Sequence, residues 1–125
     1  MKPITTGDAP RPIGPYSQAI ESGNLVFVSG QIPLDPKTGE LVAGGIKEQT
    51  KRVIENIRAI LRAAGLDLNN VVYSIVFLRD LSTFNDFNEV YSTYFNESKP
   101  ARTTVEVSNL PREALIEMTV IASRI

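Results

Sequence analysis

The chain has 125 residues, of which 42% are hydrophobic and 22% charged, a balance typical of one soluble folded domain. Its formal net charge of −1 disfavours a nucleic-acid binder that depends on neutralising phosphates. It contains no cysteine and no histidine, which excludes disulfides, thiolate or imidazole metal sites, and hydrolases with a thiol nucleophile or an imidazole base. Any chemistry must therefore use carboxylates, arginine, lysine, tyrosine, hydroxyls, backbone amides and water.

The apolar runs in the sequence are short. The longest, "LVFV" and "IVFL", contain four residues, whereas a membrane-spanning helix needs about 20. The chain does not open with a signal-peptide pattern. We therefore expect a cytoplasmic protein without a membrane partner, built as one domain over residues 1–125.

The N-terminal part of the chain predicts an arm followed by a hairpin. The first fifteen residues contain "APRPIGP", which is too rich in proline for a helix and indicates an ordered arm or a loop. Short strands are predicted from Tyr16 to Ile20 and from Leu25 to Gln31, joined by a turn at "SGN". "DPKTG", from Asp35 to Gly39, predicts a further turn, because proline presets φ and glycine accepts a positive φ.

Two amphipathic helices and a buried strand are predicted next. Apolar and small side chains recur at spacings of four and three from Ile46 to Ala64, which predicts a helix that Gly65 ends. "VVYSIVFL", from Val71 to Leu78, is apolar on both alternating faces, as expected of a central strand. A second helix is predicted from an aromatic stripe that begins after Ser82 or Thr83 and consists of Phe84, Phe87, Tyr91 and Tyr94.

Strands predicted from Thr103 to Val107 and from Leu115 to Ser123 complete the order β-β-α-β-α-β-β. This order predicts an α+β fold in which a mixed sheet carries both helices on one face. The strands with "LVFV" and "YSIVFL" would leave apolar side chains on the other face, and such a patch usually marks an association surface. We therefore expect an obligate homo-oligomer; alternatively, the proline-rich arm covers this face.

Two charged residues interrupt the predicted strands. Glu117 lies between apolar neighbours, where burial raises the pKa of a carboxyl unless a cation or several donors hold it. Arg102 begins a β-branched run shortly after Pro100, and a guanidinium fixed there can grip a small carboxylate through two parallel hydrogen bonds. The alternatives are a solvated strand residue for Glu117 and a surface arginine at a strand end for Arg102.

Other polar positions allow a functional and a structural interpretation. Ser29 and Gly30 end a strand with a hydroxyl beside backbone that a ligand can approach closely, although a β-bulge glycine fits equally. Tyr16 lies where the arm meets a strand, as a site residue or at the edge of the core. Asn88 borders the aromatic stripe, where its amide either bonds a backbone group or faces a pocket.

Several motifs together resemble the RidA/YjgF enamine/imine deaminase family, in order from about Ile13 to the C-terminus. They are "IGPYSQAI", "VFVSGQIPLDPKTGEL", "AAGL", "VFLRDLSTFNDFNEVYSTYF" and "PARTTVEVSNLP" with a downstream "IEM". The resemblance implies a chorismate-mutase-like α+β fold assembled as a homotrimer. In that assembly the sheets face an inner barrel, and the sites lie in clefts between subunits.

The resemblance also implies a role for individual residues. Arg102 would bind the substrate carboxylate, and Glu117 would position or activate water. The family often has a cysteine two residues after the arginine; here Thr104 stands in that place, so a thiol is not needed, and its backbone amide can still face the carboxylate. The matching positions are Glu117, Tyr16 and Ser29 for catalysis, and Arg102, Thr104, Gly30 and Asn88 for substrate binding.

The implied activity is that of a 2-iminobutanoate/2-iminopropanoate deaminase, which hydrolyses 2-aminoacrylate-type and 2-iminobutanoate-type substrates to 2-keto acids and ammonia. The imine carbon is already electrophilic, so a held carboxylate, a placed water and one general base suffice without a metal or a cofactor. Alternatives are a non-catalytic sensor of small carboxylates, a ribonuclease or translation inhibitor as attributed to some relatives, and a purely structural protein. The missing histidine and the negative net charge disfavour the ribonuclease and a nucleic-acid partner.

Overall fold

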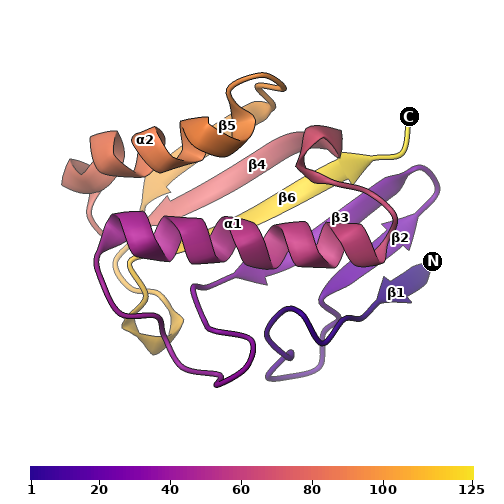
Figure 1. The fold of residues 1–125 in the computed structure, drawn as a ribbon, viewed down its shortest axis with the longest axis horizontal. Coiled ribbons are helices and arrows are strands. Elements are labelled where there is room, and N and C mark those ends of the chain that lie inside the picture. Colours follow the sequence, from indigo (N-terminus) through magenta and orange to yellow (C-terminus); the bar gives the residue numbers. More distant parts are fainter.

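A mixed sheet of six strands forms the centre of the computed structural model, which describes residues 1–125 (Figure 1). The strands lie in the order β1-β2-β3-β6-β4-β5, and the β4–β5 pair is the parallel one. The α+β fold expected from the sequence is confirmed. The strands are β1 (Lys2–Ile4), β2 (Ala19–Ser22), β3 (Leu25–Gln31), β4 (Val71–Leu78), β5 (Ala101–Glu106) and β6 (Ile116–Ser123).

The edge strand β1 is an addition to the order of elements expected from the sequence. It pairs antiparallel with β2, and Pro3 lies opposite Ile20. A proline is tolerated there because an edge strand does not need every N–H for its ladder. Ile4 at its end is buried in the core, so tertiary packing explains a strand that the local pattern does not indicate. The chain then runs as an irregular arm and enters β2 at Ala19, later than the predicted start.

Both helices, α1 (Ile46–Ala63) and α2 (Phe84–Phe95), cover the same face of the sheet (Figure 1). Every residue of the predicted stripe along α1 is buried, and Gly65 follows the helix with a φ of 78°. Phe87, Tyr91 and Phe95 are the buried aromatic residues of α2, while Phe84 and Tyr94 pack at the edge of the core. Neither helix is long and apolar enough to cross a membrane.

The two faces of the sheet differ in exposure. Toward the helices, alternate residues of β3, β4 and β6 join a core of 23 buried residues. Burial of each large aliphatic side chain stabilises the fold by about 1.5–3 kcal/mol. On the other face, Phe27 and Val105 are 42% and 40% exposed, so the arm does not cover this face as the alternative interpretation required. Association of several copies through it stays a prediction, since the structure is of one chain.

Candidate active site

Glu117 lies on the open face of the sheet. It follows the buried Ile116 and precedes the buried Met118 on β6, and its register partner on β4 is Phe77. The carboxylate forms no ion pair and accepts no hydrogen bond within the chain, and burial raises the pKa of Glu117. The structure therefore favours the interpretation of Glu117 as a perturbed carboxyl over that of a fully solvated strand residue.

Gly30 allows the backbone of β3 to pass close to this carboxylate. The register between β3 and β6 shifts between Val28 and Gln31, so the predicted β-bulge is present. A Cβ at position 30 would lie 3.0 Å from Cδ of Glu117 and closer still to its Oε2. The bulge and the close approach thus coincide, because only a residue without a side chain leaves room for the carboxyl group.

Ser29 and Tyr16 lie at the same pocket, but their hydroxyls already have partners. Oγ of Ser29 donates to the Ser17 carbonyl at 2.6 Å, which joins β3 to the segment before β2. Tyr16 is 52% exposed, and its hydroxyl accepts from the backbone N–H of Ile13 at 3.3 Å. Tyr16 is therefore not a core-edge residue. Ser29 positions the backbone of the site, and Tyr16 presents its ring to the pocket.

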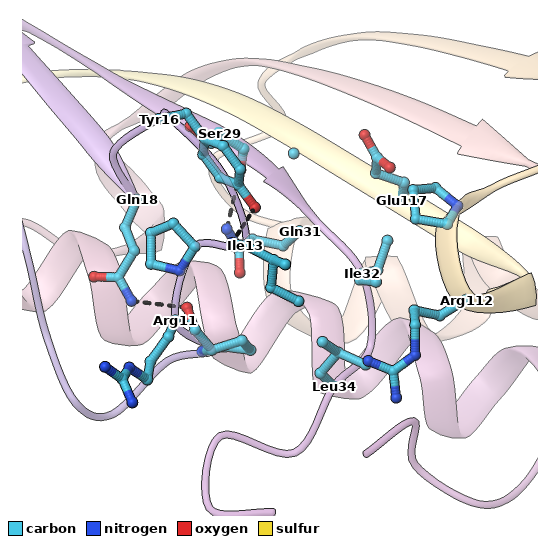
Figure 2. A pocket seen from close by; sticks show the side chains of 14 residues that line it. Arg11, Ile13, Tyr16, Gln18, Ser29, Gln31, Ile32, Leu34, Arg112 and Glu117 are labelled. Atoms are coloured by element: carbon cyan, nitrogen blue, oxygen red, sulfur yellow. Dashed lines mark hydrogen bonds between the residues drawn. The ribbon is translucent and has the colours of Figure 1, made fainter. Parts of the chain in front are cut away.

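The pocket beside Glu117 has a volume of about 660 Å³. Figure 2 shows Tyr16 and Ile13 on one side of it and Glu117 and Arg112 on the other. Its walls come from the proline-rich arm, the end of β3 and the turn that precedes β6. No pattern in the sequence assigns the arm residues or Arg112 to a site; the only signal for them is their nearness to the "GPYSQ" and "IEM" motifs.

Arg102 occupies a second location. It pairs in register with Ser74, which is buried under the helices, so its side chain faces α2. Nη1 of Arg102 donates to Oδ1 of Asn88 at 2.8 Å. Its guanidinium carbon lies 4.7 Å from the ring centre of Tyr91 and at 5.4 and 5.5 Å from the other two rings, those of Phe87 and Phe84. These contacts hold the guanidinium in place and leave other N–H groups free for a ligand.

Three further features belong to this second location, and Asn88 lines its pocket, which was one of the two alternatives predicted for it. Asn88 binds Arg102 rather than a backbone group, so its amide orients the guanidinium. Thr104 lies on the same side of β5 as Arg102, and its Oγ1 is buried without a hydrogen-bond partner. The aromatic stripe of α2, predicted as core, also forms the platform under Arg102; its i, i+3, i+7 spacing was the available signal.

Within one chain, the predicted site residues form two separate groups. Tyr16, Ser29, Gly30 and Glu117 line one pocket, while Asn88 and Arg102 line another of about 210 Å³. Arg102 faces the helices and Glu117 faces away from them, because their register partners Ser74 and Phe77 lie on opposite faces of β4. A single chain therefore does not bring the guanidinium to the carboxylate.

Comparison with known proteins extends over nearly the whole chain. The family model described as "Endoribonuclease L-PSP" matches residues 6–124. A RutC family protein of Pyrococcus abyssi is 66% identical over 119 residues, which are 95% of this chain and 94% of the relative. The 2-iminobutanoate/2-iminopropanoate deaminase of Mus musculus is 47% identical over 121 residues, covering 97% and 90%.

Solved structures agree with the fold. Escherichia coli TdcF with bound serine has a TM-score of 0.95 and 41% identity, and the match covers 100% of both chains. The YjgF gene product of E. coli also has a TM-score of 0.95, with 42% identity and the same coverage. From the family model, the identities and the matching fold, this chain belongs to the RidA/YjgF family.

Proposed function

We propose that this protein hydrolyses 2-imino acids of the 2-aminoacrylate and 2-iminobutanoate type to 2-keto acids and ammonia. The observation that carries the proposal is Glu117, a half-buried carboxyl with a raised pKa that has no partner within the chain and faces Gly30 in a large pocket. Such a group is suited to exchange protons with a water molecule. The name of the mouse relative supports the same activity.

The assembly is part of the proposal. The two groups of site residues lie on opposite faces of one sheet, and the open face presents exposed apolar side chains. We propose a homotrimer in which the Arg102 group of one subunit faces the Glu117 group of the next. A substrate between them would have its carboxylate on the guanidinium and its imine carbon near the carboxyl.

The proposed reaction needs only these groups and water. Glu117 takes a proton from water as the oxygen bonds to the imine carbon, and the electrons of the C=N bond move to nitrogen. The proton then passes to nitrogen, which gives an intermediate with a hydroxyl and an amine on the same carbon. Glu117 takes the hydroxyl proton of this intermediate and delivers it to the amine, the C–N bond breaks, and ammonia leaves as the C=O bond of the 2-keto acid forms. Arg102 holds the carboxylate throughout, so positioning and one base account for the rate increase.

A non-catalytic carboxylate sensor is the competing interpretation. The TdcF structure contains serine, so a relative of this fold binds a small amino acid. A sensor would use the same Arg102 and the same pocket, but it would not need an unpaired carboxyl against the ligand. The unpaired Glu117 is therefore the observation that favours hydrolysis over mere binding.

The test is a coupled assay in which threonine dehydratase generates 2-iminobutanoate and the release of ammonia and 2-ketobutyrate is followed. Addition of this protein should accelerate release, and addition of the Glu117→Gln protein should not. Binding of 2-ketobutyrate without acceleration would instead establish the sensor. Cleavage of RNA by the wild type that Glu117→Gln abolishes would favour the activity that the family model's description names.

A further inference from the structure

One buried amide holds the proline-rich arm against the rest of the chain. Gln18 is only 3% exposed. Its Nε2 donates to the carbonyls of Pro10 at 2.9 Å, Thr6 at 3.1 Å and Ala9 at 3.4 Å. Its Oε1 accepts from the N–H of Thr6 at 2.8 Å. Both polar atoms of the Gln18 side chain, Oε1 and Nε2, therefore form hydrogen bonds with the arm and with no other part of the chain.

The arm has few other attachments. Within residues 7–16, one backbone–backbone hydrogen bond is present, from the N–H of Tyr16 to the Gly14 carbonyl at 2.9 Å. Prolines at positions 10, 12 and 15 have no N–H to contribute. Ala9 is buried, but Ile13 is 75% exposed. The path of the arm is therefore determined mainly by Gln18.

This arm is a wall of the candidate active site. Residues 10–13 line the pocket that Glu117 faces, and Figure 2 shows one of the hydrogen bonds from the Gln18 amide to the arm, near Arg11. We propose that Gln18 is a positioning residue: its hydrogen bonds hold the arm in place as a wall of the pocket, and the position of this wall determines how well the substrate binds. Gln18 itself also lines the pocket, but its amide group is already hydrogen-bonded to the arm.

The proposal predicts which kinetic constant depends on Gln18, and this part rests on the proposed function. The carboxyl comes from β6 and Gly30 from β3, neither of which the arm carries. The backbone before β2 is separately attached, because Ser29 donates through its N–H to the Gln18 carbonyl and through Oγ to the Ser17 carbonyl. Loss of the hydrogen bonds between Gln18 and the arm should therefore raise KM about tenfold and leave kcat within about threefold. This is the pattern expected when a mutation weakens substrate binding equally in the ground state and the transition state.

The experiment compares Gln18→Met, which retains the length but none of the hydrogen bonds, with Val53→Ala as a control. Val53 is fully buried in α1 and takes no part in the hydrogen bonds between Gln18 and the arm, so its substitution lowers stability and leaves those bonds in place. Hydrogen exchange of the Thr6 N–H, which donates to Oε1 of Gln18, is read by NMR; it should accelerate at least tenfold in Gln18→Met and stay unchanged relative to the amides of α1 in Val53→Ala.

The outcomes separate this proposal from the proposed function. Unchanged hydrogen exchange of the arm in Gln18→Met would show that Gln18 does not hold the arm, whether or not the protein hydrolyses imines. Faster exchange with an unchanged KM would show that the arm does not shape the substrate site. If the wild type shows no turnover, the proposed function fails, and the affinity for 2-ketobutyrate replaces KM as the second readout. Gln18→Glu, which keeps Oε1 for Thr6 but places oxygen against three carbonyls, serves if Gln18→Met does not fold.

Discussion

At the scale of single residues, Glu117 combines burial, a raised pKa and the absence of any partner within the chain. Glu117→Gln keeps the shape of the side chain and removes the base. Turnover should fall by about 10²–10⁴-fold, the usual contribution of a positioned general base. Calorimetry should show that a 2-keto acid still binds, because a negative charge has left the pocket. Unchanged turnover in an intact assembly would show that Glu117 is not the base.

The pH dependence of the same residue gives a second prediction. Activity should decline as the pH falls through the raised pKa of Glu117, above the value of 4.5 expected for an ordinary glutamate. Because the pKa of Glu117 is higher in the folded state than in the unfolded state, protonation of Glu117 stabilises the fold. This contribution to the free energy of unfolding is present at low pH and is lost as the pH rises through the pKa of the folded state. At pH 7, Glu117→Gln should therefore melt at the same or a higher temperature than the wild type. A large loss of stability would indicate a structural role instead.

Arg102 depends on geometry more than on charge. Its guanidinium is held in place by Asn88 and by three rings of α2. A lysine ammonium cannot form the two parallel hydrogen bonds that a guanidinium forms with a carboxylate. Arg102→Lys should therefore lose most of the activity, mainly through weaker substrate binding, in the coupled ammonia assay. Full activity of the lysine variant on 2-iminobutanoate would exclude Arg102 as the carboxylate clamp.

At the scale of elements, the bulge in β3 and the strand β6 have to fit together. Gly30→Ala would place a methyl group against the Glu117 carboxyl, which must then move. We expect turnover to fall at least tenfold while the circular dichroism spectrum stays the same, since a positioned base is sensitive to displacements of about 1 Å. Gly7→Ala is the matched control, because a Cβ there meets nothing within 4 Å. Equal activity of the two variants would contradict the close approach as a functional feature.

The elements also show what can be predicted from this sequence. Periodicities of four and three along α1, and alternation along β6, determine which side chains are buried, and the structure agrees with both. The pairing of β4 with β5 in parallel, and with β6 in antiparallel, is a tertiary property that no local pattern contains. For that reason the sequence suggests candidate site residues, but it does not contain their division between two faces of the sheet.

At the scale of the whole molecule, the open face of the sheet connects assembly with activity. Phe27, Ile121 and Tyr73 lie side by side across β3, β6 and β4. Phe27 is 42% exposed in the single chain, a large apolar side chain in a central position of this face. Contiguous apolar surface of this kind is typical of an association surface. The site residues of opposite faces could meet only between copies, so activity should require the assembly.

This dependence can be measured with one substitution. Light scattering of the wild type should give about three times the chain mass of 13.7 kDa. Phe27→Asp places a charge on the open face, where burial against another copy would be costly, and should yield folded single chains without deaminase activity. Lys51→Asp, on the exposed side of α1, should remain assembled and active. A wild type of one chain's mass, or a monomeric Phe27→Asp protein with full turnover, would contradict a site shared between subunits.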